Sequence, residues 1–275
     1  MNSSQPSSPR YHTLDFGVAF GITDVGTVRH SNQDTFRVAP ELGLLAVADG
    51  MGGHEGGEIA SAGAVELLCS HLSDAPPAPP HDPDADPDAT WAGVPGGALH
   101  TLRGAIEYAN AQLYATNVER NHADGMGMGT TLTGLWHPVR HGPAYLFHVG
   151  DSRLYCWRGG AQGELLQLTR DHTLYQQALD LGAPPPLPPR NLLLQALGPG
   201  PAIQPDVSAW SMAPGDVYLL CSDGLHGESS REAIAAVMAR ARDDNLEACC
   251  AELVDMAKRD GSRDNITAVL LRCHG

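Results

Sequence analysis

Hydrophobic and polar positions change their spacing along the chain, and each spacing predicts a different element. Apolar residues recur at helical intervals in 56–72 and again in 98–119, which predicts two long helices. After residue 128, short apolar or alternating runs are typical of strands. We expect strands at 14–24, 43–49, 129–137, 143–152, 153–158, 164–169, 203–210, 216–221 and 265–272, further helices at 172–181, 230–241 and 245–259, and a short apolar segment at 191–197.

The order of these elements indicates the fold class. Many expected strands follow one another through hairpin-length turns, so much of the sheet structure should be antiparallel. The helices come in pairs and do not alternate one for one with strands, as they would in a doubly wound parallel sheet. The pattern therefore favours a layered α/β (α+β) sandwich.

Two segments lack the composition of regular structure. Residues 1–12 are rich in Ser and Pro and are expected to form a disordered tail. Residues 74–97 form an acidic, Pro-rich insert between the two long helices. Its alternating aspartates resemble the start of a calcium loop, but Pro87 stands where that loop needs glycine and Gly93 where it needs a bidentate glutamate. We interpret the insert as a solvated linker.

Charge and composition exclude several classes of protein. The 275 residues carry a formal net charge of −15, which argues against binding to nucleic acid or to an anionic membrane surface. No apolar run is long enough for a membrane span, and the N-terminal residues lack the apolar core of a signal peptide. The six cysteines form no CxxC pair, as expected for reduced thiols in a cytoplasmic protein.

A glycine-rich loop follows the expected strand 43–49, and several chemistries use such a loop. From Gly50 the chain reads G-M-G-G-H-E, so Glu55 stands where a dinucleotide-binding loop needs its third glycine. No Lys-Ser/Thr pair follows, as a P-loop requires, and the chain contains no G-x-S-x-G nucleophile motif. These three interpretations therefore fail.

Aspartates at strand ends suggest a different chemistry. Asp49, Asp151, Asp223 and Asp264 each adjoin an apolar run and a turn that contains Gly, Ser or Asn. One such aspartate is usually a turn former or a helix cap. Four of them, brought together by a sheet, would repel one another unless divalent cations lay between them. Carboxylate and carbonyl ligands without a Cys or His cluster suit Mg²⁺ or Mn²⁺.

The chain resembles a known family at seven motifs that occur in the family's order. They are TDVGTVRHSNQD (23–34), VADGMGGHEGGE (47–58), GMGTT (127–131), HVGDSR (148–153), TRDHT (169–173), CSDGL (221–225) and SRDNIT (262–267). This series resembles the metal-dependent protein phosphatases of type 2C (PPM), in particular their stand-alone bacterial branch. The resemblance implies a single domain over 13–273 and a four-layer sandwich, in which helix pairs flank two packed antiparallel sheets.

The resemblance also implies a metal centre with two core ions, Mn²⁺ or Mg²⁺, and a third, weaker one. Asp49 matches the carboxylate that bridges two metals, and the Gly50 carbonyl matches a further ligand of the second. Asp223 and Asp264 match the ligands of the first metal. Asp34 matches the acidic position beside the second metal, acting through bound water.

A third site would involve Asp151, with Asp223 as the shared ligand. The resemblance implies that a hydroxide bridging the two core metals attacks phosphoserine or phosphothreonine, while Arg29 binds the phosphate. His54 either protonates the leaving group or contacts the third metal through water. Thr130, Thr131 and Asn265 match supporting positions, and Asp171-His172 are expected to order the junction before the helix at 172–181.

At two places the chain departs from the family pattern, and each departure limits which family properties can be expected of this chain. Gln33 stands where many relatives carry Glu, which removes an acidic charge beside the second metal. The flap segment, 173–198, is rebuilt around APPPLPP (183–189), so substrate choice does not follow from the resemblance. The proline run is interpreted as a stiff loop, with a docking ligand for an aromatic groove as the alternative.

The predicted function is that of a cytoplasmic protein serine/threonine phosphatase that opposes a bacterial Ser/Thr kinase. Its expected partners are phosphoproteins and a cognate kinase, with no nucleic acid and no membrane, and the chain is expected to be a monomer. The alternative is a catalytically inactive module that binds phosphoproteins without turning them over. The complete set Arg29, Asp49, Asp223 and Asp264 argues against that alternative.

Overall fold

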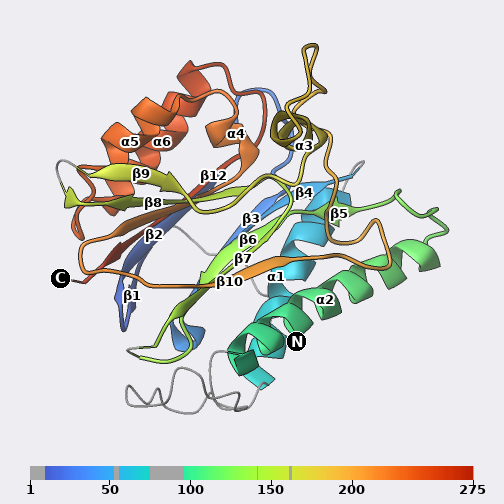
Figure 1. Ribbon diagram of the computed structural model, residues 1–275, viewed down its shortest axis with the longest axis horizontal. Helices are drawn as coiled ribbons and strands as arrows, with labels where there is room; N and C mark the ends of the chain where they lie inside the picture. The colour runs from blue at the N-terminus through green and yellow to red at the C-terminus, as the bar shows by residue number, and fades with distance from the viewer. Residues whose placement is uncertain (1–9, 53–55, 75–95, 141, 161–162, 275) are drawn as a thin grey trace.

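Two six-stranded antiparallel sheets form the centre of the computed structural model (Figure 1). The structure describes residues 10–52, 56–74, 96–140, 142–160 and 163–274. The first sheet has the order β1 (Tyr11–Leu14), β2 (Gly17–Asp24), β12 (Ile266–Cys273), β11 (Val217–Cys221), β8 (Arg153–Arg158) and β9 (Glu164–Gln167). The second has the order β10 (Asp206–Trp210), β7 (Ala144–Val149), β6 (Leu132–Trp136), β4 (Leu44–Met51) and β3 (Asp34–Ala39), with β5 (Gly129–Thr130) paired to β4.

Helix pairs cover the outer face of each sheet. The long helices α1 (Gly56–Asp74) and α2 (Gly96–Glu119) contact each other and the second sheet, and α5 (Arg231–Met238) and α6 (Leu246–Arg259) cover the first. Phe36, Leu45 and Val47 from the second sheet pack between the sheets against residues such as Tyr218 and Leu220 from the first. The layers therefore run helix, sheet, sheet, helix, which confirms the predicted α+β sandwich.

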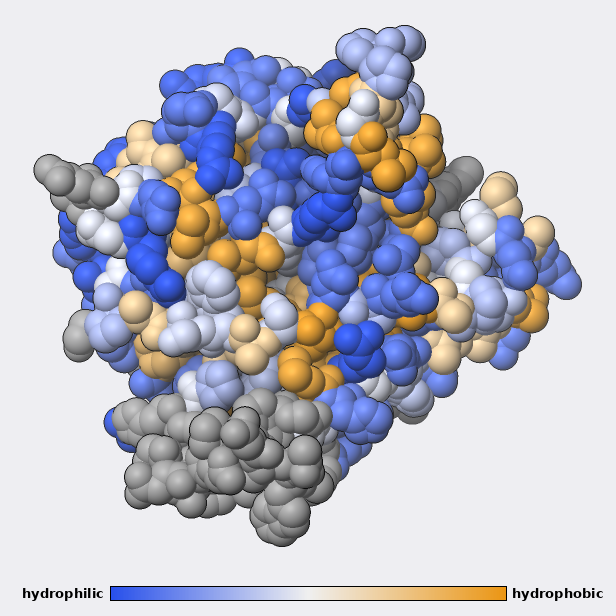
Figure 2. Space-filling model, viewed as in Figure 1, coloured by the Kyte–Doolittle hydropathy of each residue, from blue (hydrophilic) through white to orange (hydrophobic). Residues whose placement is uncertain are grey.

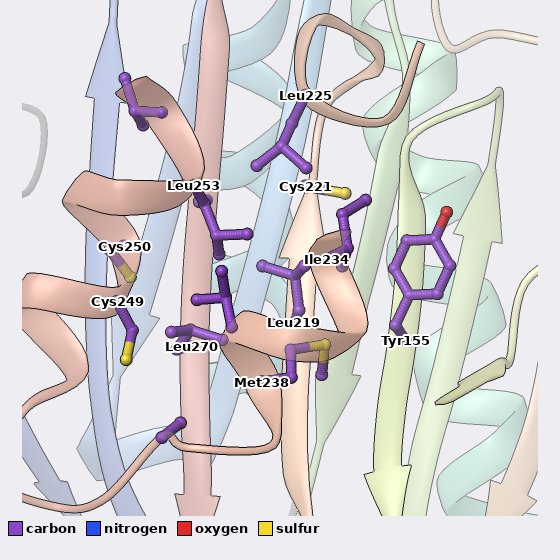
Figure 3. Packing of buried hydrophobic residues seen from close by; sticks show 14 of the residues in the cluster. Tyr155, Leu219, Cys221, Leu225, Ile234, Met238, Cys249, Cys250, Leu253 and Leu270 are labelled. Atoms are coloured by element: carbon purple, nitrogen blue, oxygen red, sulfur yellow. The ribbon is translucent and has the colours of Figure 1, made fainter. Parts of the chain in front are cut away.

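Helical spacing explains why α5 and α6 lie on the first sheet. Their apolar side chains Ile234, Met238 and Leu253 are almost fully buried and pack against Leu219 of β11 and Leu270 of β12 (Figure 3). Burying one such side chain contributes about 1.5–3 kcal/mol. Truncating Leu253 to Ala would leave a cavity and should cost about 2–5 kcal/mol of folding free energy.

The cysteines are free thiols, as the sequence predicts. Five of them are buried, and burial raises the pKa of Cys221 and of Cys156 to about 12 each. These two residues act as small apolar side chains of the core.

The strand expected at 14–24 is wrong as a single element, because the chain turns back at Asp15 and Phe16. Leu14 pairs with Gly17 across this two-residue turn, so β1 and β2 form a hairpin. A Cβ at Gly17 would clash with the carbonyl of Arg272 on the neighbouring strand. The hairpin begins at Tyr11, so the last two residues of the expected tail belong to the sheet.

The expected elements differ from the observed ones at further points. Strand β3 and the short helix α4 (Asp223–His226) were not predicted, and the strand expected at 129–137 divides into β5 and β6 around Thr131. The expected helix at 172–181 begins later, as α3 (Leu174–Asp180), since Thr173 caps it by accepting the N–H of Gln176 at 3.1 Å. Residues 1–9 of the expected tail and 75–95 of the expected insert lie outside the described residues. No helix in the described part of the chain is long and apolar enough to cross a membrane. Hydrophilic side chains cover much of the face that Figure 2 shows.

Candidate metal centre

The site begins where strands β3 and β4 carry carboxylates on facing positions. Asp34 and Asp49 are direct partners in the antiparallel register of these strands. Like charges at such positions repel each other. Ser222 and Thr267 each donate a hydroxyl hydrogen bond of 2.7 Å to Oδ2 of Asp34, while its Oδ1 is buried without a hydrogen-bond partner in the described residues.

The backbone of Asp49 is held by two threonines, Thr130 at the end of β5 and Thr131 between β5 and β6. Its N–H donates to Oγ1 of Thr131 at 2.9 Å, and its carbonyl accepts from the Thr131 N–H and the Thr130 hydroxyl, each at 2.9 Å. The next residue must be glycine, because a Cβ at Gly50 would clash with the carbonyl oxygen of Gly57. The end of β4 is therefore fixed in place on both sides.

The first sheet contributes Asp223 and Asp264. Asp223 begins α4 directly after β11, and Asp264 lies just before β12. The Arg29 guanidinium forms an ion pair of 2.6 Å with Oδ2 of Asp264, which raises the pKa of Arg29. Asn265 joins the site to the loop before β3 by accepting the Gln33 N–H at 2.8 Å.

Burial and mutual repulsion raise the pKa values of the carboxyl groups of Asp34, Asp49 and Asp223. Burial raises the pKa of Asp34 to about 7, with repulsion from Asp223 and Asp264 added and the two hydroxyl hydrogen bonds opposing it. Burial raises the pKa of Asp49 well above its usual range, and repulsion from Asp34 and Asp223 adds to the effect. Burial and then repulsion from Asp264 raise the pKa of Asp223, while a hydrogen bond from Asp49 opposes the rise.

Asp151 lies at the edge of this cluster, in the turn between β7 and β8. Burial raises its pKa to about 7, with repulsion from Asp223 and Asp171 added. Its carbonyl accepts a hydrogen bond of 2.9 Å from Nε2 of His226, so that nitrogen carries the proton. Burial lowers the pKa of His226 to about 3, which keeps the ring neutral.

His172 fixes the same turn from the other side. Its backbone N–H donates to the Gly150 carbonyl at 2.7 Å, and its Nδ1 accepts the Gly150 N–H at 3.3 Å. Because Nδ1 accepts, the neutral ring carries its proton on Nε2, which donates to Asp206 at 3.2 Å. The neighbouring Asp171 binds Arg153 through two hydrogen bonds of 2.7 and 2.8 Å. Both residues therefore order this junction, as the sequence analysis expected.

A cleft of about 440 Å³ opens beside the acidic cluster. It is lined by Val28, Arg29, Asp223, Gly224, Gly227, Glu228, Ser262, Arg263 and Asp264. Arg29 and the two lining aspartates therefore face the same space. A phosphate group entering the cleft would meet a guanidinium and two candidate metal ligands together.

Divalent metal ions fit this donor set by its chemistry. The side chains are hard oxygen donors, and Oδ1 of Asp223, like that of Asp34, is buried without a hydrogen-bond partner in the described residues. No group of three or more His, Cys, Asp or Glu side chains within those residues forms a ready-made cage for an ion. Asp264 is instead paired with Arg29, so a cation bound there would compete with the guanidinium.

Comparison with known proteins identifies the family. The family model described as Protein phosphatase 2C matches residues 27–270 of this chain. The chain belongs to the protein phosphatase 2C family. The matched range includes every residue assigned above to the candidate site.

Curated relatives of this protein phosphatase 2C member are bacterial. The serine/threonine protein phosphatase PstP of Mycobacterium tuberculosis is 36% identical over 254 residues, which is 90% of this chain and 43% of PstP. The serine/threonine phosphatase stp of Listeria monocytogenes is 32% identical over 259 residues, 90% of this chain and 93% of that protein. This chain therefore spans less than half the length of PstP but nearly all of the Listeria protein.

Solved structures of the family share the fold. A crystal structure of M. tuberculosis PstP superposes with a TM-score of 0.76 at 31% identity and covers 94% of this chain and 98% of that one. A second PstP structure, of the catalytic domain in complex with two manganese ions, has a TM-score of 0.74 at 31% identity and the same coverage. Metal binding is thus seen in a relative whose solved domain matches nearly this whole chain.

The structure brings together the six residues of this protein phosphatase 2C chain that were predicted as metal ligands. They are Asp34, Asp49, Gly50, Asp151, Asp223 and Asp264, which the register of β3 and β4 and the repulsion among the carboxyl groups show to be neighbours. Their role as metal ligands stays a prediction. Arg29 forms an ion pair with Asp264, and its role as a phosphate ligand stays a prediction. His54 lies outside the described residues, so its predicted role stays a prediction.

Sequence reasoning missed several residues that support the site. Ser222 and Thr267 hold Asp34, and His226 holds the Asp151 turn. Ser222 and Thr267 stand next to or near predicted ligands in CSDGL and SRDNIT, so proximity to a motif aspartate was the available signal. Gln33 has a structural role, since its carbonyl accepts the Gly50 N–H at 3.1 Å and the Ser61 hydroxyl at 2.6 Å.

Proposed function

We propose that this chain is a protein serine/threonine phosphatase that hydrolyses phosphoserine and phosphothreonine and requires Mn²⁺ or Mg²⁺. One observation carries the proposal: four aspartates with raised pKa values gather beside a cleft in which Arg29 faces Asp223 and Asp264. Carboxylates that repel one another in a buried site are stabilised when cations bind between them. A phosphate group bound beside such cations and a guanidinium would have its negative charge neutralised by both.

The residues proposed to hold the ions are those that match the metal ligands of the family. Asp49 and the Gly50 carbonyl at the end of β4 would serve the two core ions together with Asp223 and Asp264. Asp34 would act beside the second ion. Asp151, with Asp223, would serve a third and weaker site. When bound, the ions would lower the pKa of water and act as Lewis acids toward the phosphate.

The chain's own residues would orient the substrate and keep the site rigid. The planar guanidinium of Arg29 can bind two phosphate oxygens at once, and its exposed side chain can turn from Asp264 toward a ligand. Thr130 and Thr131 fix the backbone of Asp49, so its carboxylate would not need to reorganise during the reaction. His54 is proposed to protonate the leaving serine or threonine oxygen, or to contact the third metal through water.

The natural substrates would be phosphoproteins made by a bacterial Ser/Thr kinase. This part of the proposal is supported by the names of the relatives, PstP and stp, which are serine/threonine phosphatases. The alternative remains an inactive module that binds phosphoproteins. The two differ in turnover, because a binding module would retain a phosphopeptide without releasing phosphate.

Turnover with and without metal tests the proposal. Purified protein should release phosphate from a phosphothreonine peptide and hydrolyse p-nitrophenyl phosphate with Mn²⁺, and EDTA should abolish both activities. Replacing Asp49 and Asp223 together by Asn should reduce turnover to background. The matched control replaces Asp244 and Asp255 by Asn, since both are exposed and the change in charge is the same. Peptide binding without turnover in the wild-type protein would support the inactive module instead.

A further inference from the structure

A second arginine lines the cleft and has no role in the proposed chemistry. Arg263 lies in the turn before β12, between Ser262 and Asp264, and its side chain is exposed. Arg29, the other arginine of the cleft, already pairs with Asp264 at 2.6 Å. Within the described residues, Arg263 forms no ion pair or hydrogen bond through its guanidinium.

The place of Arg263 in the cleft distinguishes it from the other arginines. Arg153, Arg158 and Arg240 are held by ion pairs with Asp171, Asp216 and Glu252. Arg103 on α2 is exposed and has no ion pair in the described residues, but it does not line the cleft. The nearest sequence neighbour of opposite charge, Asp264, is directed to Arg29 instead. Arg263 therefore presents, at the wall of the cleft, a guanidinium that has no ion-pair partner in the described residues, although Glu228 lines the same cleft.

We propose that Arg263 is a specificity residue that binds an acidic side chain of the substrate next to the phosphorylated residue. This inference rests on the proposed phosphatase function. Arg29 would bind the phosphate, and Arg263 would form an ion pair with an Asp or Glu on the same peptide. The preferred substrates are then phosphothreonine or phosphoserine peptides with a nearby carboxylate.

The size of the cleft limits how far that carboxylate lies from the phosphoresidue. A space of about 440 Å³ has a side of about 8 Å if it is roughly cubic, which equals two to three residues of extended chain at about 3.3 Å each. The acidic residue should therefore occupy one of the two positions before or after the phosphorylated residue.

The net charge of −15 does not oppose this local preference. At physiological ionic strength, charges separated by more than about 8 Å are largely screened. An acidic side chain inside the cleft would thus respond mainly to the charges that line it, among which Arg263 is the arginine without an ion-pair partner in the described residues. One exposed ion pair corresponds to about a two- to fivefold preference.

Paired peptides measure this preference directly. Four phosphothreonine peptides carry a single Asp at position −2, −1, +1 or +2, and each is compared with the same peptide carrying Asn. With Mn²⁺, the ratio of kcat/KM for Asp over Asn should be about two- to fivefold for the wild-type protein at one or more positions. The ratio should fall to about one for Arg263→Ala, stay raised for Arg263→Lys and drop below one for Arg263→Glu.

Substitution of an arginine far from the cleft is the control for Arg263→Ala. Arg103→Ala removes the same charge from an exposed position on α2 and should leave the Asp/Asn ratio at its wild-type value. Equal ratios in the wild-type and Arg263→Ala proteins at all four positions would overturn the inference and leave the phosphatase function standing. Failure of the wild-type protein to hydrolyse any peptide or p-nitrophenyl phosphate with Mn²⁺ would instead overturn the proposed function, and this inference with it.

Discussion

The two ends of strand β11 carry buried aspartates in opposite electrostatic situations. Asp216, just before the strand, is 2% exposed and pairs with Arg158 at 2.5 Å. It also accepts hydrogen bonds from the Ala213 N–H at 2.9 Å and the Tyr218 hydroxyl at 3.0 Å. Asp223, just after the strand, has a buried Oδ1 without a hydrogen-bond partner in the described residues and is surrounded by other carboxylates.

The presence or absence of a compensating partner distinguishes a structural carboxylate, Asp216, from a candidate functional one, Asp223. A buried charge is tolerated when a counter-ion and hydrogen bonds compensate it, as they do for Asp216. At the other end of the strand, Arg29 pairs with Asp264 and also acts on Asp223 and Asp49, while Asp34 is held by hydroxyl groups alone in the described residues. The excess of negative charge is best explained by cations that bind there.

Replacing Asp223 by Asn should give the largest effect on catalysis. Removing one group that stabilises charge in the transition state costs between about a hundredfold and a thousandfold. We expect a decrease of that size in kcat/KM for p-nitrophenyl phosphate with Mn²⁺. Asp216→Asn, at the opposite end of β11, should stay within about twofold of the wild-type value. Similar losses in both variants would remove the distinction between the two ends.

For stability we expect the opposite order, with a larger loss in Asp216→Asn than in Asp223→Asn. Asp216→Asn leaves the guanidinium of Arg158 without its ion pair, so the free energy of unfolding should fall by about 2 kcal/mol. Asp223→Asn removes a repelled carboxylate, so it should leave the unfolding free energy in EDTA unchanged or slightly higher. Urea denaturation of the two variants and the wild-type protein measures both values. A stability loss in Asp223→Asn larger than that in Asp216→Asn would contradict the comparison.

Substitution of Arg29 should have a smaller effect on catalysis than loss of Asp223. Arg29→Ala removes one of several groups expected to neutralise the phosphate, and we expect kcat/KM to fall about tenfold, mostly through KM. Arg29→Lys should recover part of the loss, because it keeps the charge but not the two-point contact. Arg103→Ala serves as the remote control. An Arg29→Ala enzyme with unchanged KM would exclude Arg29 as a phosphate ligand.

The smallest effect concerns pH in the absence of metal. The pKa of Asp34 is raised to about 7, so the folded protein holds this proton more tightly than the unfolded chain, in which Asp ionises near pH 4. Its contribution to stability is therefore fully present below about pH 4 and is lost as the pH rises to about 7. Relative to Asp34→Asn, the wild-type protein in EDTA should lose a few degrees of Tm between pH 5 and pH 7.5.

A Tm difference between the wild-type and Asp34→Asn proteins that does not change with pH would show that Asp34 is ionised throughout this range. Mn²⁺ should reduce the pH dependence of the wild-type protein, because a bound cation favours the ionised carboxylate. Asp216→Asn, compared in the same way, provides the reference for a carboxylate that an arginine already compensates.

The sequence was sufficient for the fold class, and it named the aspartates that the structure places near one another, whose metal-binding role stays a prediction. Periodic apolar positions located both long helices and most strands, since helices and strands bury side chains at different intervals. Strand β3 was missed although its residues alternate between buried and half-exposed positions. Its first residue, Asp34, is also the last residue of the RHSNQD motif, and the five residues that follow are a short run for recognising alternation.

What the sequence by itself determined is the set of acidic side chains and the type of sandwich that carries them. Only the tertiary structure decided how those charges are compensated, because the partners are far apart along the chain. Ser222 reaches Asp34 across 188 positions, and Arg29 reaches Asp264 across 235. Strand register and sheet packing create these contacts. The same packing leaves Arg263 exposed in the cleft without a partner in the described residues, which no local sequence pattern indicates.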